Sequence, residues 1–587
     1  MGSRGTGRVC AGARQLYELK QRAAEYYRTN GVPGRIEEAL NVIFFSNPDD
    51  VYGALANWFT EISKAPVISR MTGKKVLDGT GQLTVQVEIL CIVQNNEKSM
   101  SSVVMSAGSG LTDSVISEAA EASERKREQS VATALEWIRE ALNPLLKGLV
   151  PTEQLKADQL LSDYFTEKLE EQVRKQEVKE AEFPLVPVPS KPVTPLKKRK
   201  NSPKGRRSPT SEKSIPPAEP AEPVLKGSIA IGATSLAVAK AGSVVNKSPL
   251  YLYIASLKHK QQLAQKMTMP IPLVTLLSCG KSAPGKMNLM KEVIGIPSTD
   301  LTIRESIDVF LALQKQISVL TDKVTKAGPV VKNLTSLGCI ALACDRLEQP
   351  LDIIQEACNH LRLELGRNIQ LAINCAAHEL MDYTKGKYEV MNGNFKSPDE
   401  MVDMYVDLIS RYPSIIALID PLRKEDQEQW TNIYNTLSSK CYLIAEAATK
   451  SVSKLLESRN TNIPRSSGLV MKHIDGTTIS HLIEVVQLVE GENQITIMGS
   501  MEEESSEDSL ADLAVGLEAR FIKLGGLIRG ERATKYNRLL VIEEEMRDSE
   551  ILDQRQNHTF PYIADKPQTS LKSNTTPSEE TEEGHHQ

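Results

Sequence analysis

The sequence predicts an α/β fold whose largest part is an eight-stranded barrel of strands alternating with helices. Two observations predict it. Six short apolar runs recur between Leu371 and Glu545. After the first gap they start every ~26 residues, the length of one strand, one helix and two loops. The segments between them are amphipathic, as from Met401 to Ile409. Strands buried on both faces and alternating with helices indicate a parallel sheet, and this many units favour closure into a barrel. The runs begin at Leu371, Ser414, Cys441, Gly468, Ile495 and Arg520.

Each of these apolar runs ends on, or next to, a polar residue. In barrels of this kind the chemistry lies at the C-terminal ends of the strands. We therefore expect a functional site built from the residues at those ends, which are Asn374, Asp420, Glu446, Lys472, Ser500 and Lys523.

Composition narrows the class of protein. The chain has 587 residues, enough for two to four domains, and its net charge of −5 gives no general attraction to nucleic acid. The eight cysteines are scattered without a C-x-x-C pair, mostly in apolar runs, so buried reduced thiols are expected rather than disulfides or a zinc site. The first residues lack the apolar core of a signal peptide, and no apolar run has membrane-spanning length. These features predict a cytoplasmic protein that binds neither nucleic acid nor membrane.

Residues 1–64 are expected to form a separate helical hairpin. A first helix is expected to end at Gly31-Val-Pro-Gly. The apolar residues from Ile36 to Phe44 are spaced to form a stripe along one face of a second helix. Asn47-Pro-Asp-Asp is expected to cap a third helix, with Pro48 in its first turn. A hairpin of this size can bury only a small part of its apolar surface by itself, which favours a dimeric bundle. The alternative is a helical extension that packs on its own chain.

The hairpin resembles the dimerisation and docking domains of protein kinase A regulatory subunits and of Dpy-30-type proteins. The matching residues are Val32-Pro, Ile36-Glu-Glu-Ala-Leu, Pro48-Asp-Asp-Val-Tyr-Gly and Trp58-Phe. The resemblance implies a groove for an amphipathic helix of the A-kinase-anchoring type.

The next part is expected to be an α+β domain interrupted by a linker. Residues 67–93 alternate apolar and polar side chains as half-buried strands do, and helices are expected over 112–147 and 153–179. Residues 180–224 are rich in Pro, Ser and Lys and are expected to be disordered, with Lys197-Lys-Arg-Lys either a nuclear signal or a solvated stretch. The predicted divisions are 1–64 for the hairpin, 65–165 with 225–265 for the α+β domain, 166–224 for a helix end and linker, 266–548 for the barrel and 549–587 for a disordered tail.

Several stretches resemble enolases, and they occur in the order of that family. They are Val76-Leu-Asp-Gly-Thr-Gly-Gln-Leu-Thr-Val-Gln-Val, the small-residue stretch 232–241, Met269-Pro-Ile-Pro, Arg411-Tyr-Pro-Ser-Ile-Ile-Ala-Leu-Ile-Asp-Pro, Ala511-Asp-Leu-Ala-Val-Gly-Leu and residues 529–545. The resemblance covers 65–548 apart from the linker and is strongest to the divergent, sperm-type branch of the family. It implies an enolase-type barrel with an N-terminal α+β cap domain.

Enolases convert 2-phosphoglycerate to phosphoenolpyruvate and water, and they use magnesium to stabilise the enolate intermediate. By resemblance, Lys472 is the catalytic base, and Glu292 and Lys523 bind the substrate. The resemblance also makes Glu446 a magnesium ligand and places Ser109 in the mobile loop over the site. That loop is Ser106-Ala-Gly-Ser-Gly, which could close over the site as a lid but would equally suit an ordinary strand end.

Other positions of the enolase site have changed in this chain. The two remaining metal carboxylates of the family align with Asn374 and Ile419. Asp420 is the next residue after Ile419, but one step along a strand points a side chain to the opposite face, so Asp420 is not expected to replace the missing carboxylate. Magnesium needs hard oxygen ligands, so this set predicts a weakened metal site. The remaining changed positions, which hold catalytic or phosphate-binding residues in the family, are Ser282, Ile340, Met501, Glu502 and Glu503. The run of glutamates is expected to be a solvated loop rather than a new metal site.

Two functions follow from the resemblance. The first is a divergent enolase of glycolysis with a partly degraded site, working as a homodimer or as a heterodimer with another enolase. The second is a weak or inactive enolase-like scaffold, tethered through its hairpin to an anchoring protein, as in a sperm flagellum. Lys472 and Lys523 are either working groups or members of a structural ion network with Glu446 and Glu292, and the sequence leaves both open.

Overall fold

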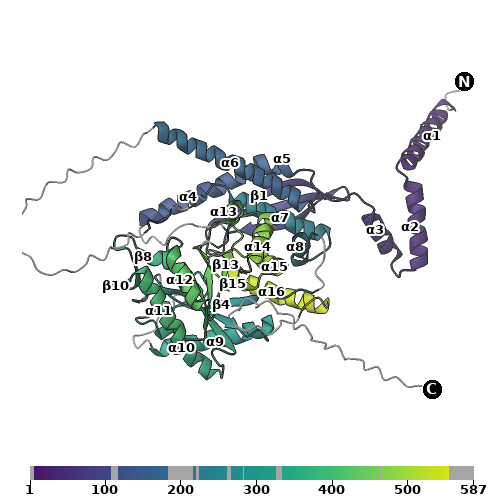
Figure 1. Ribbon diagram of the computed structural model, residues 1–587. Coiled ribbons are helices and arrows are strands. Elements are labelled where there is room, and N and C mark those ends of the chain that lie inside the picture. Colours follow the sequence, from purple (N-terminus) through teal and green to yellow (C-terminus); the bar gives the residue numbers. More distant parts are fainter. Residues whose placement is uncertain are drawn as a thin grey trace, which may run out of the picture.

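The chain folds as three units in the computed structural model, which describes residues 6–106, 117–182, 216–219, 222, 224–260, 266–281, 283, 285–324, 334–462 and 464–553. Helices α1–α3 stand apart from a cap domain that lies against the barrel (Figure 1). Ser109, Ser282 and most of the predicted linker and tail lie outside the described residues.

Eight strands form the closed barrel that the apolar runs predict, because the last strand of the series pairs with the first. All six predicted runs are strands of it. In order around the barrel the strands are β4 (Ile271–Gly280), β5 (Leu289–Pro297), β7 (Ile369–Asn374), β11 (Ile415–Ile419), β12 (Tyr442–Ala445), β13 (Gly468–Met471), β14 (Ile495–Gly499) and β15 (Phe521–Gly525). A two-residue strand, β6 (Ile340–Ala341), pairs with β4 outside this ring.

The prediction of a wholly parallel sheet is wrong for one strand. Strand β5 runs antiparallel to both of its neighbours, β4 and β7. The connection from Gly280 to Leu289 is too short for the crossover helix that a parallel pair requires. Because β5 begins at the end of the barrel where its neighbours finish, Glu292 near its start pairs directly with Asn374 at the end of β7.

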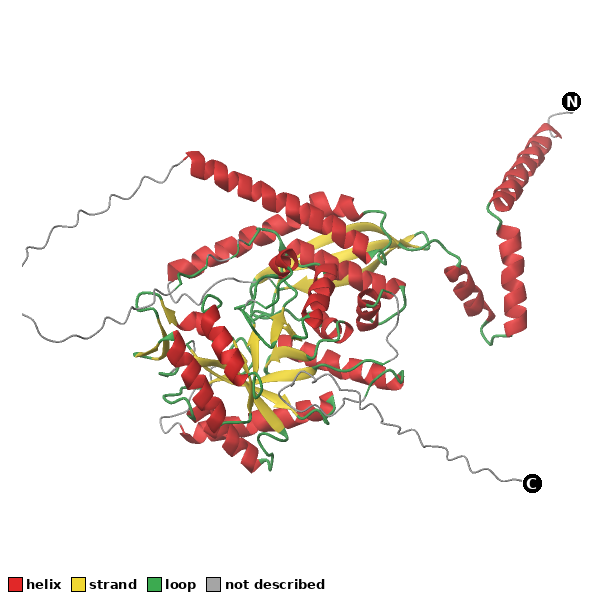
Figure 2. Ribbon diagram, viewed as in Figure 1, coloured by secondary structure: helices red, strands yellow, loops and turns green. Residues whose placement is uncertain are grey.

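A ring of helices covers the outside of the barrel (Figure 2). They are α9 (Ile303–Val324), α10 (Gln349–His360), α11 (Pro398–Arg411), α12 (Gln427–Leu437), α13 (Val452–Ser458), α14 (Ile479–Gly491), α15 (Ser509–Gly516) and α16 (Gly530–Asp548). Helix α11 shows how the sequence sets their starts: Ser397 and Glu400 form a capping box, and Pro398 occupies the first turn. Between α10 and α11 lie a 3₁₀ turn (Ala377–Leu380) and a small sheet of β8 (Met381–Asp382), β9 (Lys387–Met391) and β10 (Asn394–Lys396).

The cap domain combines an antiparallel sheet with helices. The sheet contains β1 (Val67–Leu77), β2 (Leu83–Val93) and β3 (Asn96–Met105), and the helical elements are α4 (Ser117–Glu136), a π-helical turn (Trp137–Leu142), α5 (Asn143–Leu146), α6 (Gln154–Glu182), α7 (Ile229–Val245) and α8 (Leu250–Lys258). Helix α7 is almost wholly buried, and its small residues allow this. A Cβ atom on Gly232 would lie 2.5 Å from the carbonyl oxygen of Asp475, so only glycine fits there. Within the described residues no single helix is long and apolar enough for a membrane span, although the sharply bent pair α7 and α8 qualifies jointly.

The N-terminal unit is helical as predicted, with α1 (Thr6–Thr29), α2 (Val32–Ser46) and α3 (Val51–Glu61). The expected cap of α3 is wrong in detail, because Pro48 lies before the helix and not in its first turn. Asp50 is the N-cap, and its carboxylate accepts the backbone N–H of Gly53 at 2.8 Å. An aspartate in that position satisfies an otherwise unpaired donor of the first turn, which fixes the start of α3 at Val51.

Asp158 on α6 joins the cap domain to the barrel. Its buried carboxylate accepts the backbone N–H of Ser480 at 2.9 Å and the hydroxyl of Ser235 at 2.6 Å. Gln154 donates to the same carboxylate at 2.9 Å. A negative charge at the N-terminus of barrel helix α14 is favourable in itself, and here it comes from the other domain.

We predict that Asp158→Ala destabilises the protein by roughly 3 kcal/mol, because several buried donors lose their only charged acceptor. Urea unfolding followed by circular dichroism measures the change. Asp163→Ala on the exposed face of the same helix is the matched control and should stay within about 0.5 kcal/mol of the wild type. Equal effects of the two substitutions would contradict a role for Asp158 at this contact.

Candidate active site

Four charged side chains from four barrel strands meet at the mouth of the barrel. Glu446 and Lys472 directly follow β12 and β13, whereas Lys523 lies inside β15 and Glu292 near the start of β5. Lys472 Nζ is 2.7 Å from Glu446 Oε1. Lys523 Nζ is 2.6 Å from Glu292 Oε1 and 3.2 Å from Glu446 Oε2. We call these four residues the mouth network.

The mouth network is buried, which makes its charges interdependent. The side chains of Glu292, Lys523 and Glu446 are 1%, 7% and 10% exposed, and that of Lys472 is 26% exposed. Burial alone would raise the pKa of Glu446, but the two ammonium groups overcome it and hold that pKa far below its usual range. Burial alone would lower the pKa of Lys523, yet the carboxylates of Glu292 and Glu446 raise it. Glu446 and Lys523 are therefore both charged at neutral pH.

Asn374 and Thr275 fix the orientation of Glu292. The side-chain amide of Asn374 donates to Glu292 Oε1 at 2.7 Å, and the Thr275 hydroxyl donates to Glu292 Oε2 at 2.7 Å. The backbone N–H of Ala376 donates to Asn374 Oδ1 at 3.1 Å. This last donor turns the amide oxygen of Asn374 toward the backbone and its nitrogen toward Glu292.

Asp420 and Ile419 are not members of the mouth network. Ile419 is fully buried in the apolar cluster of barrel-strand residues. The backbone at Asp420 turns to a φ of 46°, and its carboxylate accepts the N–H groups of Glu446, Ala447 and Ala448 at 2.8, 2.7 and 3.2 Å. Burial and the nearby Glu446 raise its pKa. Asp420 thus caps the loop that carries Glu446.

The glutamate run after β14 is paired, so the expectation of a solvated loop is wrong for Glu503 and Glu504, whereas Glu502 stays half exposed. Glu502 pairs with Lys291, which also lies 2.7 Å from Glu379. Glu503 lies 2.6 Å from Arg127 on cap helix α4, and Glu504 lies 3.6 Å from Lys535 on α16. Since Lys291 and Arg127 supply cations from another strand and another domain, the loop is held between cap and barrel.

Arg532 on α16 also anchors the loop after β14. This fully buried side chain donates to the hydroxyl of Ser500 at 2.5 Å and to the carbonyls of Met501 and Glu502, both at 2.7 Å. Ser500 at the end of β14 and the changed position Met501 are therefore loop anchors in this structure, and neither side chain joins the mouth network. Ile340 lies buried in β6.

A small cavity of about 50 Å³ lies between the cap strand β3 and the loop after β14. Ser106, His473, Glu504 and Lys535 are among its lining residues. His473 Nε2 is buried there without a hydrogen-bond partner, and burial lowers the pKa of His473 to about 4. The imidazole is therefore neutral at physiological pH, and the space suits a water molecule rather than a substrate.

Sequence reasoning missed the cations that pair with this loop. Lys291 could have been found, because it directly precedes Glu292, which the resemblance places in the substrate site. Arg127 offered no signal, since its partner Glu503 is distant in sequence and lies in another domain. Arg532 falls inside a recognised motif, but nothing in the motif showed that it anchors the loop after β14.

The donor set does not fit magnesium. Mg²⁺ takes oxygen ligands in near-octahedral geometry, whereas both carboxylates of the mouth network already carry ammonium groups. Asn374 presents its nitrogen to the network, and Asp420 is occupied by backbone donors. No group of three or more His, Cys, Asp or Glu side chains suited to a metal occurs among the residues that the structure describes.

Comparison with known proteins identifies the family. Residues 266–559 match the family described as the enolase C-terminal TIM barrel domain. The chain is 53% identical to Enolase 4 of Xenopus laevis over 96% of this chain and 98% of the relative, and 49% identical to Enolase 4 of Homo sapiens over 98% and 95%. It is also 31% identical to an enolase of Metallosphaera sedula over 54% of this chain and 73% of the relative. The chain therefore belongs to the enolase family, as a divergent member.

Proposed function

We propose that this chain is a weak phosphopyruvate hydratase, which forms phosphoenolpyruvate from 2-phosphoglycerate far more slowly than enolases with a complete metal site. One observation carries the proposal. The residues that resemble the family's base and substrate-binding groups, Lys472, Lys523 and Glu292, all lie within one ion network at the barrel mouth.

The proposed roles follow from the positions of these groups. Lys472 is the most exposed member of the network, so it can leave Glu446, give its own proton to solvent and, as a neutral amine, take the proton from carbon 2 of the substrate. The ammonium group of Lys523 would face the substrate carboxylate, on which negative charge builds up. Glu292 lies beside Lys523 and would contact the leaving hydroxyl group.

The missing groups set the expected rate. Enolases generally use Mg²⁺ to stabilise the charge of the enolate, and the donor set of this chain does not fit that ion. Loss of a single group that stabilises a transition state typically costs about 10²–10³ in rate, and such losses do not simply add within one site. Glu502 and Glu503 also replace neutral or cationic residues near the expected phosphate position. We therefore expect turnover at least ~10³-fold below that of a metal-complete enolase.

We predict that Lys472→Ala abolishes the remaining formation of phosphoenolpyruvate, because it removes the base. The assay uses purified full-length chain, freed of the host's own enolase, with 2-phosphoglycerate in excess. Lys440→Ala, which removes an exposed lysine away from the mouth network, is the control and should keep wild-type turnover. A wild-type rate no higher than that of Lys472→Ala would refute the enzymatic proposal.

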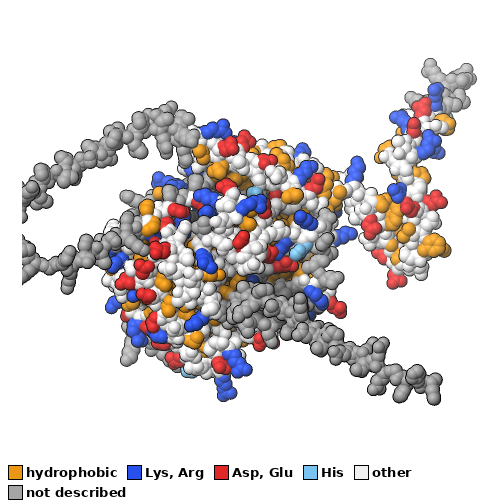
Figure 3. All heavy atoms as spheres, in the orientation of Figure 1, with side chains coloured by type: hydrophobic (Ala, Val, Ile, Leu, Met, Phe, Trp, Pro, Cys, Tyr) orange, Lys and Arg blue, Asp and Glu red, His pale blue; other side chains and the backbone are white. Residues whose placement is uncertain are grey.

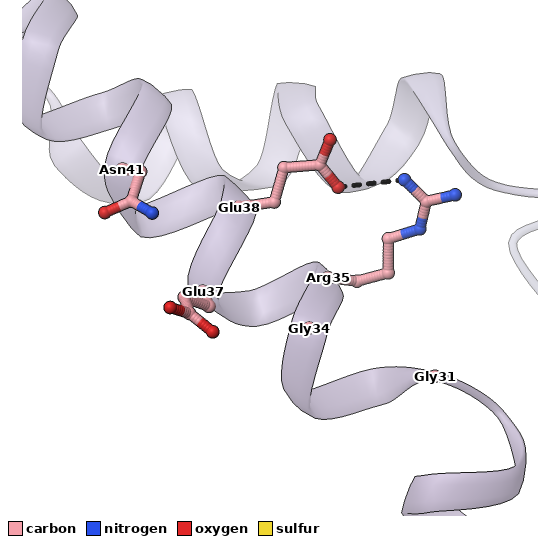
Figure 4. A pocket seen from close by; sticks show the side chains of 6 residues that line it. All are labelled: Gly31, Gly34, Arg35, Glu37, Glu38 and Asn41. Carbon is pink, nitrogen blue, oxygen red and sulfur yellow. Dashed lines mark hydrogen bonds and ion pairs between the residues drawn. The ribbon is translucent and has the colours of Figure 1, made fainter.

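A second candidate function is favoured by the N-terminal hairpin. Hydrophobic side chains lie open on the surface of α1–α3 (Figure 3), and Phe44, Phe45 and Tyr52 are 78%, 84% and 84% exposed. Exposed apolar surface of this kind marks a protein-binding site. By contrast, the side chains around the hollow at the start of α2 are charged or polar, with Arg35 and Glu38 paired at 2.9 Å (Figure 4).

We propose that the apolar faces of two such hairpins pair, and that the resulting bundle binds an amphipathic anchoring helix. Tethering in this way would place the barrel on a cytoskeletal structure such as a flagellum. The proposal is independent of turnover, because the hairpin shares no residue with the mouth network. Pairing through the barrel domains, with a second copy or with another enolase, remains part of the family-based proposal.

We predict that Leu40→Asp separates the two chains of a hairpin-linked dimer. Leu40 is 52% exposed, and a charge at this position opposes the pairing of two apolar faces. Sedimentation of full-length protein gives the mass. The matched control is Asn41→Asp, which adds the same charge to the polar hollow and should leave the mass unchanged. If both variants sediment as the wild type does, the hairpin is not the dimer contact.

A further inference from the structure

The ammonium group of Lys523 lies buried between two carboxylates that belong to different barrel strands. Its Nζ atom is 2.6 Å from Glu292 Oε1, on β5, and 3.2 Å from Glu446 Oε2, which follows β12. A divalent ion at the barrel mouth would have to use these same two carboxylates, because Asn374 and Asp420 are turned to other partners.

We propose that Lys523 is the resident cation of this barrel mouth. Its ammonium group stands between Glu292 and Glu446 in place of a divalent metal ion, so the mouth is complete without magnesium. Removal of the ammonium group would accordingly create a site for a divalent cation.

The charge balance of the mouth network supports the proposal that Lys523 takes the place of a metal ion. Two carboxylates and two ammonium groups balance each other, which matters because a buried unpaired charge is strongly destabilising. A metal ion added to this set would leave two positive charges in excess next to Lys523. The present arrangement therefore favours the ammonium group over the metal.

The hydrogen bonds lead to the same conclusion. Both oxygens of Glu292 already accept hydrogen bonds, from Asn374 and from Thr275. Glu446 Oε1 is paired with Lys472, whereas the buried Oε2 atom lies near Lys523 without a well-directed hydrogen bond. Glu446 Oε2 is thus the oxygen most readily available to a new cation once Lys523 no longer occupies the space.

The test uses Mn²⁺ as the probe, because it prefers the same oxygen ligands as magnesium and its binding is visible by electron paramagnetic resonance. Full-length wild-type protein is stripped with a chelator and titrated, and its thermal midpoint is measured with and without Mn²⁺. We expect no Mn²⁺ uptake and no change of midpoint. Lys523→Met should bind Mn²⁺ and gain at least ~3 °C on its addition, since a ligand that binds only the folded state stabilises it.

Two matched variants separate this effect from a general loss of positive charge. Lys472→Met also removes an ammonium group from Glu446 but keeps Lys523, and it should gain no Mn²⁺ binding. Lys523→Met with Glu446→Gln lacks one of the two carboxylates and should lose the Mn²⁺ binding of the single variant.

Either of two results would overturn the proposal. One is Mn²⁺ uptake by the wild type that disappears in Glu446→Gln. The other is a folded Lys523→Met variant that binds no Mn²⁺. Should Lys523→Met fail to fold in chelator, recovery of the fold on refolding with Mn²⁺ supports the proposal, and failure to recover with Mn²⁺ counts against it. None of these readouts depends on turnover of 2-phosphoglycerate.

Discussion

The pairing of one carboxylate, Glu446, with two ammonium groups organises the barrel mouth. Lys472 and Lys523 come from strands on either side of β14, and each would be costly to hold in a buried position without a negative partner. Glu292 completes the charge balance from the antiparallel strand β5. Asp420, although buried and acidic, serves this network only indirectly, by fixing the loop that presents Glu446.

A second set of ion pairs holds the loop after β14, and one pair of this set joins the loop to the cap domain. The loop after β14 carries three successive glutamates, and each is paired with a cation from a different part of the chain, namely Lys291, Arg127 and Lys535. Where the family resemblance leads one to expect groups that attract a phosphate, this chain has carboxylates that are already neutralised. The loop therefore contributes to the contact between domains.

The features of the fold and of the site that could be predicted are those encoded by residues close together in the sequence. The barrel and the positions of Glu446 and Lys472 followed from buried runs that end on polar residues, because strand ends collect at one end of such a barrel. Glu292 was found only through resemblance, since β5 runs against its neighbours and its site residue lies near its start. The pairing of Glu503 with Arg127 was not predictable, because it joins two domains across a long stretch of sequence. The start of α3 was misplaced because Asp50, rather than Asn47, satisfies the first free donors of that helix.

The ammonium group of Lys523 lies between Glu292 and Glu446, where we propose that it takes the place of a metal ion. Anomalous diffraction from crystals grown with Mn²⁺ tests this most directly. We predict no anomalous peak between the two carboxylates, with the Lys523 side chain in the position described here. A peak at that position, with Lys523 displaced from both carboxylates, would contradict the claim and would show that the barrel mouth still holds the metal of its family.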